Sequence, residues 1–594
     1  MVVLTPDAKI NENGGKYAGL DRFEARKQIV ADLEAQGYLV KVRKHNHAVG
    51  HCYRCNTVIE PRVSRQWFVK MAPLAAPALE AVKSGKITIQ PKRWEKVYYN
   101  WLENIRDWCI SRQIRWGHRI PAWYGPDQKV FVAKSETEAK DQALAFYGHE
   151  VELTQETDVL DTWFSSALWP FSTMGWPEKT ELLERFYPTS TLVTGADIIF
   201  FRVARMVMMG IYQMKEVPFH DVLFHGIVRD DLGRKMSKSL GNSPDPLKLI
   251  DEYGADAIRF TMIYNTSAGQ DVHFSEKLLE MGRNFANKVR NATNFVLMNL
   301  EGFDAKKVNK ADLDFELVDQ WIYSRLHETI DQVNKNLDTY TLDEAAKAVY
   351  EFIRGDFCDW YVEMAKVRLY ANEDLRSKTT AQRVLRDVLE SALKLLHPFM
   401  PFITEELWQH IKLEGETIML ADFPKADQTL ISSKVDNAMS YIQEVITALR
   451  NIRAEAGVAP SKEVSALIKT ASESELSILS DNKAFLMKLA KLSSLEFGKE
   501  LQKPDLSGFR VVGQSEIIVP LLGLLDIEAE SKKILDQIAK LEQGLANTNA
   551  KLSNETFVSK APAAVIEREK ANLADYQQKI EKLQANLALL KGSK

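Results

Sequence analysis

Cysteine is scarce in this chain, with four in 594 residues, so a disulfide framework is excluded and a reducing compartment is expected. Long apolar runs are also missing, because the best candidate, residues 198–212, is interrupted by Arg202 and Arg205. The first residues have neither the basic nor the apolar segment of a signal peptide. Charge of one sign is lacking too: 77 Lys and Arg oppose 81 Asp and Glu, a net charge of −4. Composition therefore predicts a cytoplasmic protein that does not enter a membrane, and any nucleic-acid contact must use local basic faces.

The length predicts roughly four domains at about 150 residues each. Residues 51–300 mix β-rich runs (129–133, 191–193 and 221–228) with helical stretches, which is typical of an α/β domain. Residues 301–430 are nearly all helix-patterned, with Val318, Ile322 and Leu326 along one face. A small mixed domain is expected over 431–525. The predicted fold is thus multidomain, with an α/β core followed by a helical bundle.

Several local signals predict where helices begin and end. Asp21 and Gly37 bound a helix in which Phe23, Ile29 and Leu33 recur at helical spacing. Thr341-x-x-Glu344 has the form of a capping box. Asp245 and Pro246 have the residue types of a helix cap and first helical position.

The C-terminal block, residues 526–594, carries apolar residues at heptad spacing in two segments separated by residues 553–562. One interpretation is a dimerisation zipper. The proline-containing break within one chain favours self-pairing, which predicts an antiparallel coiled-coil hairpin.

The segment Gly233-Arg-Lys-Met-Ser-Lys-Ser-Leu-Gly-Asn242 is the most informative for chemistry. It presents two cations, Lys235 and Lys238, and two hydroxyl donors, Ser237 and Ser239, which a polyphosphate leaving group needs as its negative charge grows. The alternative is an ordinary solvated lysine loop. The sequence contains no G-x-x-x-x-G-K-[ST], so a P-loop is excluded.

Cys52 and Cys55, with His47 and His51 before them, could form half of a zinc site. A second ligand pair is not evident, so structural cysteines are the favoured alternative. Between residues 94 and 123 tryptophans alternate with four arginines in a manner that could meet an RNA strand, although core packing is the interpretation favoured for the tryptophans; the arginines are Arg106, Arg112, Arg115 and Arg119.

Lys235-Met-Ser-Lys-Ser239 resembles the second signature of the class I aminoacyl-tRNA synthetases. The strings Thr157-Asp-Val-Leu-Asp-Thr-Trp-Phe-Ser-Ser-Ala-Leu-Trp-Pro170 and Ser111-Arg-Gln-Ile-Arg-Trp-Gly-His-Arg-Ile-Pro-Ala-Trp-Tyr124 are similar to those of the valyl-tRNA synthetases. Further matching strings are Phe357-Cys-Asp-Trp-Tyr361, His397-Pro-Phe-Met-Pro-Phe-Ile-Thr-Glu-Glu-Leu-Trp408 and Asn451-Ile-Arg-Ala-Glu455. The resemblance covers essentially the whole chain, in the family's order.

This resemblance implies ATP- and Mg²⁺-dependent activation of valine to valyl-adenylate, followed by transfer to tRNA(Val), in a monomer. It implies a partial Rossmann-like catalytic core over 51–300, preceded by the end of an editing insertion over 1–50. Residues 301–430 would be the anticodon-binding bundle, 431–525 a connecting domain and 526–594 a tRNA-binding arm. Lys235 and Lys238 would neutralise the triphosphate, and four further residues would line the adenylate site: Gly195, Asp197, His225 and Gly226.

Three departures from the family pattern matter. The first signature, His-x-Gly-His, is absent, as is most of the editing domain, so the chain resembles the C-terminal two-thirds of a synthetase. Arg202 stands where the family has a tryptophan that walls the valine side chain, which would put charge beside an apolar pocket. We therefore expect a valine-tRNA ligase chain that is inactive alone, because a half-site cannot align ATP with the amino acid. The alternatives are a non-catalytic tRNA-binding derivative and an isoleucine or other branched-chain synthetase.

Overall fold

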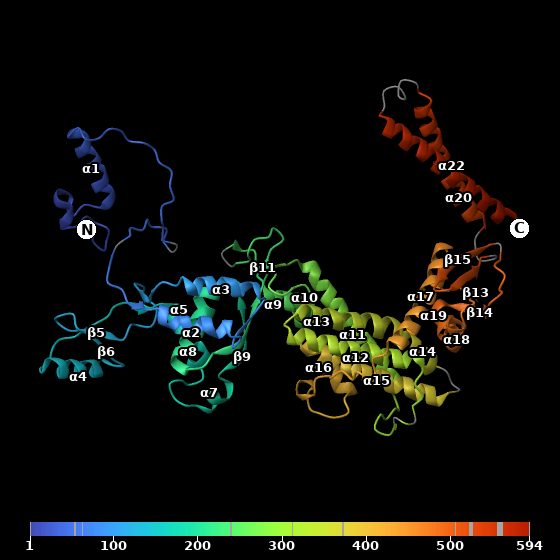
Figure 1. Ribbon diagram of the computed structural model, residues 1–594, viewed down its shortest axis with the longest axis horizontal. Coiled ribbons are helices and arrows are strands. Elements are labelled where there is room, and N and C mark those ends of the chain that lie inside the picture. The colour runs from blue at the N-terminus through green and yellow to red at the C-terminus, as the bar shows by residue number, and fades with distance from the viewer. Residues whose placement is uncertain are drawn as a thin grey trace. The chain divides into compact units, whose positions relative to one another are not determined.

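The computed structural model describes residues 2–52, 55–61, 63–237, 240–309, 311, 313–370, 374–504, 506–521, 527–554 and 562–592 (Figure 1). The chain divides into two compact units, Met1–Phe224 and His225–Lys594. Within the part of the chain that the structure describes, no helix has the length and apolarity needed to span a bilayer.

The first unit alternates short strands and helices. Its helices are α1 (Arg22–Ala35), α2 (Ala72–Lys83), α3 (Arg93–Glu103), α4 (Glu136–Tyr147), α5 (Thr162–Ser166), α6 (Trp169–Ser172), α7 (Glu181–Phe186) and α8 (Ala204–Met214). Its strands are β1 (Phe68–Val69), β2 (Thr88–Gln90), β3 (Trp108–Cys109), β4 (Ser111–Arg112), β5 (Ala122–Tyr124), β6 (Val130–Val132), β7 (Thr154–Gln155), β8 (Val159–Leu160), β9 (Thr189–Gly195) and β10 (Phe219–His225).

A three-stranded sheet, in the order β2-β10-β9, organises the core of this unit. Strands β10 and β2 run parallel, with Val222 opposite Ile89. Helices α2 and α8 bury their apolar residues together with those of β2 and β10. The β-rich runs predicted at 129–133 and 191–193 are confirmed as β6 and β9, and the run at 221–228 divides between β10 and β11 (Val228–Arg229).

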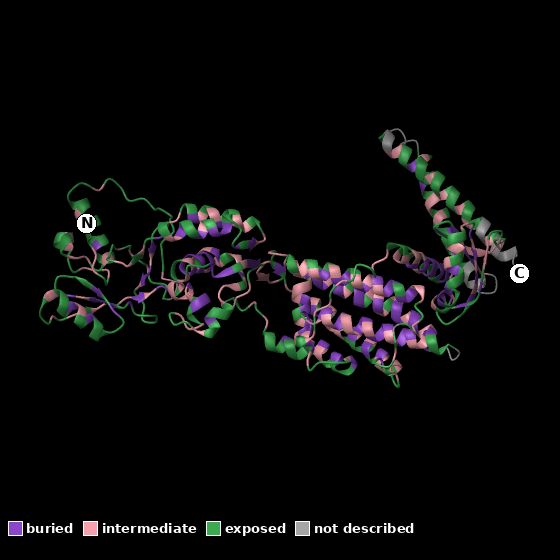
Figure 2. Ribbon diagram, turned by 60° about the horizontal axis from the view of Figure 1, so that its bottom comes forward, coloured by how far each residue is buried: buried purple, intermediate pink, exposed green. Residues whose placement is uncertain are grey.

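Helix α1 forms as its end signals predict. The Asp21 carboxylate accepts a hydrogen bond from the Phe23 amide (2.8 Å), and Gly37 adopts a φ of 73° just beyond the helix. Its apolar residues Phe23, Ile29 and Leu33 are nevertheless exposed, as the green colouring around α1 in Figure 2 shows. Helical spacing therefore predicted the helix but not a buried face.

The second unit is mainly helical. Its helices are α9 (Pro246–Tyr253), α10 (Ala255–Tyr264), α11 (Glu276–Asn299), α12 (Leu317–Asp338), α13 (Leu342–Glu351), the π-helix η6 (Phe352–Tyr361), α14 (Val362–Leu369), α15 (Leu375–Leu396), α16 (Pro401–Ile411), α17 (Ser433–Glu455), α18 (Glu473–Asp481), α19 (Lys483–Ala490), α20 (Ile527–Leu552) and α22 (Ala563–Gly592). Its strands are β11, β12 (Val272–His273), β13 (Val464–Lys469), β14 (Leu492–Gly498), β15 (Ser507–Val512) and β16 (Ser515–Pro520).

One continuous buried cluster holds the helices of this unit together, and buried residues line the facing sides of the bundle in Figure 2. Val318, Ile322 and Leu326 belong to the cluster, as their spacing predicted. The cluster also includes Phe260 and Phe285, so bundle packing starts before the predicted domain boundary at residue 300. The domain boundaries otherwise stay predictions.

The cap predicted at Asp245 is confirmed, because its carboxylate accepts from the Leu247 amide (3.0 Å) at the start of α9. The capping box predicted at Thr341 is wrong. Thr341 precedes α13 but makes no side-chain cap; its hydroxyl donates to the Asn336 carbonyl (3.2 Å), and Glu344 instead binds Lys347 (2.8 Å). A competing local acceptor therefore replaced the cap.

The small mixed domain contains a four-stranded sheet in the order β14-β13-β16-β15. Beyond it, α20 and α22 pack antiparallel, since Lys551 pairs with Glu569 (3.5 Å) while Ile538 lies in a cluster with Leu583. That cluster also contains Leu506, just before β15, which anchors the hairpin. Coiled-coil geometry for the hairpin stays a prediction.

Candidate active-site loop and adenylate-site residues

The described half of the lysine loop is tied to strand β11. Lys235 forms a β-bridge with Arg229, and the Met236 amide donates to the Val228 carbonyl (3.3 Å). Strand β11 pairs in turn with β12. Lys238 and Ser239, both predicted site residues, lie outside the described residues.

Asp230 and Asn242, which the sequence did not single out, brace this loop. Asn242 accepts from the Ser237 amide (2.9 Å) and donates through Nδ2 to the Asp230 carboxylate (2.9 Å). The Asn242 hydrogen bond, together with the Arg234 guanidinium, holds the pKa of Asp230 well below its ordinary value. Asn242 and Asp230 therefore connect described residues that lie before and after positions 238 and 239.

His225 is the last residue of β10, and Gly226 follows it before β11. The exposed His225 ring is hydrogen-bonded to the Gly226 carbonyl through Nδ1 (2.7 Å). A Cβ at Gly226 would lie 1.6 Å from the Gln270 carbonyl oxygen. Position 226 thus admits only glycine, because two backbone segments cross there.

The other predicted site residues belong to the first unit. Gly195 is the last residue of β9, and the exposed Asp197 lies in the 3₁₀ turn η2 (Ala196–Ile198) that follows. Arg202 lies next, in the π-helix η3 (Ile199–Val203). The site residues are therefore divided between the two units, with His225, Gly226, Lys235 and Ser237 in the second.

Arg202 is half-buried, and its Nε is shielded from solvent without a hydrogen-bond partner. Leaving a buried donor unsatisfied destabilises the folded state. The neighbouring aromatic residue Phe201 stacks on Trp163 at 5.8 Å between ring centroids. Arg202 thus places a charged side chain directly after two aromatic residues, Phe200 and Phe201.

The buried Asp161 forms ion pairs with two arginines, one of which, Arg205, lies three residues after Arg202. It pairs with Arg112 (2.6 Å) and Arg205 (3.7 Å), and accepts from the Trp108 indole (3.0 Å). The Arg205 guanidinium lies 3.7 Å from the Trp108 ring centroid, and burial lowers the pKa of Arg205 to about 10. Arg112 therefore serves a structural ion pair and is not available as a free RNA contact.

Cys52 and Cys55 lie in a turn closed by hydrogen bonds between Cys52 and Thr57 (2.8 Å) and between Asn56 and Cys52 (2.7 Å). The Thr57 hydroxyl lowers the pKa of Cys55. A structural zinc needs four ligands, and the described residues bring together no group of three or more His, Cys, Asp or Glu. These cysteines alone do not fit zinc.

Core packing for the tryptophans is confirmed at Trp108 and Trp123, which are 8% and 5% exposed, and is wrong at Trp116, which is 92% exposed. Trp116 lies in the loop between β4 and β5, where the chain turns outward from the sheet. The neighbouring residues could not distinguish these tryptophans, because a charged residue precedes both the buried Trp108 (Asp107) and the exposed Trp116 (Arg115).

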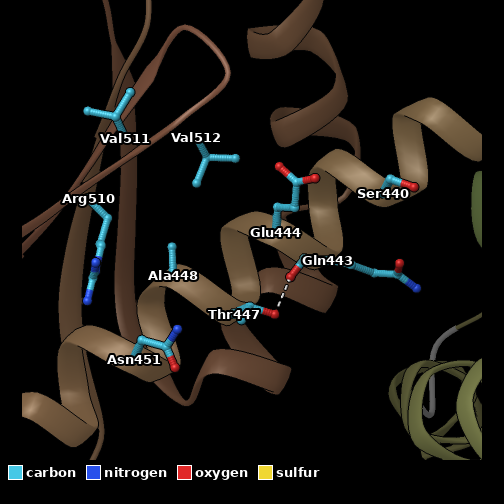
Figure 3. A pocket seen from close by; sticks show the side chains of 9 residues that line it. All are labelled: Ser440, Gln443, Glu444, Thr447, Ala448, Asn451, Arg510, Val511 and Val512. Atoms are coloured by element: carbon cyan, nitrogen blue, oxygen red, sulfur yellow. Dashed lines mark hydrogen bonds between the residues drawn. The ribbon is translucent and has the colours of Figure 1, made fainter.

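The second unit also has an open groove of about 480 Å³ between α17 and β15, which no predicted site residue lines (Figure 3). Figure 3 shows Asn451 and Thr447 on α17 facing Arg510 on the strand. Arg510 forms an ion pair with Glu455. The groove is polar along α17 and apolar at Val511 and Val512.

Three family models match the chain in succession. Residues 18–275 match "tRNA synthetases class I (I, L, M and V)", 319–468 match "Anticodon-binding domain of tRNA ligase", and 526–591 match "Valyl tRNA synthetase tRNA binding arm". The valine–tRNA ligase of Fusobacterium nucleatum is 64% identical over 98% of this chain, and that of Geobacter sulfurreducens is 49% identical over 98%. The chain belongs to the valine–tRNA ligase family. It spans 66% of the length of each of these two relatives.

Among solved structures, methionyl-tRNA synthetase of Mycobacterium tuberculosis with methionyl-adenylate has a TM-score of 0.47 at 20% identity, covering 60% of this chain and 65% of that one. The lysine loop of this chain lies within residues 18–275, the segment that matches the class I synthetase model. The helical bundle falls largely in the anticodon-binding match, and α20 and α22 fall in the arm match.

Proposed function

We propose that this chain supplies the lysine loop, the anticodon-binding bundle and the tRNA-binding arm of a valine–tRNA ligase. The reaction is ATP-dependent activation of valine to valyl-adenylate and transfer of valine to tRNA(Val). The observation that carries this proposal is the Lys235–Ser239 signature, whose described residue Ser237 is held by Asn242, within a chain 64% identical to a valine–tRNA ligase.

In this proposal the loop acts on the triphosphate. Lys235 and Lys238 place positive charge near the leaving pyrophosphate, and Ser237 and Ser239 offer hydroxyl donors to it. Asp230 and Asn242 keep the described half of the loop turned, so less conformational entropy is lost when ATP binds. Mg²⁺ enters bound to the ATP oxygens and neutralises part of their charge.

Gly195, Asp197, His225 and Gly226 are proposed to line the adenylate site. At Gly226 the absence of a side chain lets the Gln270 backbone pack against it, and the exposed carboxylate of Asp197 can accept from a ribose hydroxyl or an amino group. Zinc is not part of the proposal. A cytoplasmic location and a monomeric state stay predictions.

Valine activation also needs the His-x-Gly-His signature, which this sequence does not contain. We therefore propose that the 594 residues alone do not form valyl-adenylate. The test is valine-dependent exchange of pyrophosphate into ATP, with the chain alone and with the added third of the Fusobacterium nucleatum relative that this chain does not match. Exchange that appears only in the mixture, and is lost in Lys238→Ala, supports the proposal.

Exchange by the chain alone, well above a no-enzyme control, would contradict it. A non-catalytic tRNA-binding role is the second candidate, favoured by Arg202 and by the absent signature. That role predicts tRNA binding but no pyrophosphate exchange, either by the chain alone or by the mixture.

A further inference from the structure

The loop between β4 and β5, residues 113–119, presents the most solvent-exposed tryptophan of the described chain. Trp116 is 92% exposed, whereas Trp108 and Trp123, before and after the loop, are buried. Ile114 of the same loop is also exposed. An indole held in water costs free energy that burial against a partner would recover.

This exposure does not come from a loose loop. The Leu160 amide donates to the His118 carbonyl (2.7 Å), and the Ile120 amide donates to the Asp158 carbonyl (3.1 Å). Gly117 lies so close to β8 that a Cβ there would approach Val159 to 2.7 Å. Before Trp116, strand β4 pairs with β8, with Arg112 opposite Val159. Trp116 therefore projects from a segment that is held to β8 both before and after it.

The charge around Trp116 is positive. The loop Gln113-Ile-Arg-Trp-Gly-His-Arg119 contains two arginines and one histidine and no acid. Arg115 is exposed and has no ion pair among the described residues, and Arg119 uses its Nε for the Glu156 carbonyl (2.6 Å). The Asp158 carboxylate accepts a hydrogen bond from the Gln113 side-chain amide (2.6 Å).

An exposed aromatic ring flanked by exposed arginines suits single-stranded nucleic acid, since the ring stacks a base and the cations meet the phosphates. A protein partner would more often cover an apolar patch with a polar rim. The combination of one indole and two arginines in seven residues therefore favours an RNA strand.

We propose that Trp116 is a stacking platform for an unpaired base at the 3′ end of tRNA, with Arg115 and Arg119 beside the adjoining phosphates. The loop lies within the stretch that matches the class I synthetase model, whereas the anticodon-binding and arm matches lie elsewhere in the chain. The 3′ terminus is the unpaired strand that an aminoacylating segment must meet. The choice of tRNA as the source of this strand rests on the proposed function.

The experiment measures binding of two probes to the full chain. The first is a tRNA(Val) transcript, intact or lacking its unpaired 3′ nucleotides; the second is a free ten-nucleotide single-stranded RNA that carries 2-aminopurine, whose fluorescence falls on stacking. Trp116→Ala should weaken binding of intact tRNA about 5- to 100-fold, from the usual contribution of one stacked base. Trp116→Phe should retain most of the affinity.

Trp169→Ala is the matched control, because Trp169 is a second exposed tryptophan of the same unit, 59% exposed, with no arginine next to it in sequence. It should bind like the unaltered chain. The truncated tRNA should bind equally to the Trp116→Ala variant and the unaltered chain. Quenching of 2-aminopurine should be lost in Trp116→Ala only.

Equal affinity of Trp116→Ala and the unaltered chain for intact tRNA overturns the proposal. A loss that persists with truncated tRNA also overturns it, because the contact would then lie elsewhere on the RNA. If no variant binds tRNA, the proposed tRNA partner fails; Trp116-dependent quenching of the short RNA would still support the platform, and its absence would reject it. A change in self-association of Trp116→Ala in sedimentation would assign the indole to a protein contact instead.

Discussion

Asn242 links both sides of the lysine loop through single hydrogen bonds to Ser237 and Asp230. Removing its amide should release the turn without touching a buried core. We expect Asn242→Ala to increase the rate of trypsin cleavage after Lys235 several-fold at pH 7, whereas Asn265→Ala, which loses only a local bond to Thr261, should not. Peptide mapping by mass spectrometry measures this, and equal cleavage rates in both variants would assign the turn to the backbone alone.

The same brace should depend on pH. Because the pKa of Asp230 is depressed in the folded state, its contribution to the turn is present above the unfolded pKa of about 3.9 and is lost as pH falls further. The loop should therefore remain protected from trypsin across pH 5–8. The rate of cleavage after Lys235 should vary with pH only as much as the rate at which trypsin cleaves a short peptide substrate. A loop that opens near pH 6 would mean that another group controls it.

Arg202 and Arg205 lie one helical turn apart and should respond oppositely to substitution. Arg205 stacks on Trp108 and faces Asp161, so Arg205→Ala leaves a buried carboxylate with one cation fewer and should destabilise the first unit. Arg202 has a buried Nε without a partner, so Arg202→Trp replaces an unsatisfied donor with apolar contact.

In the mixture with the unmatched third of the Fusobacterium nucleatum relative, we expect Arg202→Trp to raise valine-dependent exchange at least tenfold, about 1.4 kcal/mol. The measurement is kcat/KM for valine in pyrophosphate exchange. Unchanged or lower exchange in Arg202→Trp, at equal thermal stability, would place residue 202 outside the valine pocket.

At the scale of elements, the sequence predicted where helices begin and end more reliably than which helix faces are buried. Asp21 and Gly37 predicted the ends of α1 because capping is local, but the exposure of Phe23 and Leu33 depends on what packs nearby. Thr341 shows the reverse failure, since a nearby carbonyl at Asn336 took the hydroxyl that the cap required. The brace by Asp230 and Asn242 was not predictable, because twelve residues of chain must fold back before the two side chains meet.

Helices α12, α14 and α15 meet at a buried charge cluster that spacing could not reveal. Arg368 donates to Asp319 (2.6 Å) and to Ser377 (2.7 Å), and Tyr361 donates to Asp319 (2.7 Å). Both Asp319 and Arg368 are nearly inaccessible to solvent. The Arg368 guanidinium of α14 thus joins Asp319 of α12 to Ser377 of α15, and the Asp319 carboxylate also binds Tyr361 at the end of η6.

Arg368→Met should lower the free energy of unfolding by about 3–5 kcal/mol, because it leaves the Asp319 carboxylate buried without its cation. The exposed pair of Lys335 and Asp331 provides the control, and Lys335→Ala should cost less than about 1 kcal/mol. Urea unfolding followed by far-ultraviolet circular dichroism measures both. The double variant Asp319→Leu/Arg368→Met should recover much of the loss; a double variant as unstable as the single one would show that the pair stabilises in its own right.

For the whole molecule, the anticodon-binding and tRNA-binding-arm models both match the second unit. Under the proposed function, the arm offers the clearest test of how tRNA affinity is distributed. Several of its cations are already neutralised within the hairpin: Lys551 pairs with Glu569, Lys570 with Glu567 and Lys579 with Asp575. Among the described residues, no ion pair involves three other arm cations, Lys540, Arg568 and Lys582. Cationic side chains without a neighbouring carboxylate can bind RNA phosphates without first breaking an ion pair.

Replacing Lys540, Arg568 and Lys582 with glutamine should therefore weaken tRNA binding and reduce the slope of log affinity against log salt by about two to three units, since each phosphate contact contributes about 0.7–0.9. The matched triple variant at Lys551, Lys570 and Lys579 removes the same charge but should change the slope less, because those cations must first leave their carboxylates. Both variants keep Leu506 covered by the hairpin, unlike a deletion of residues 526–594, so a lost contact is not confused with a newly exposed apolar surface. Filter binding across 50–300 mM salt gives both slopes. Identical slopes in the two variants would mean that the arm attracts tRNA through its net charge, and an unchanged slope in both would assign α20 and α22 to packing or self-association.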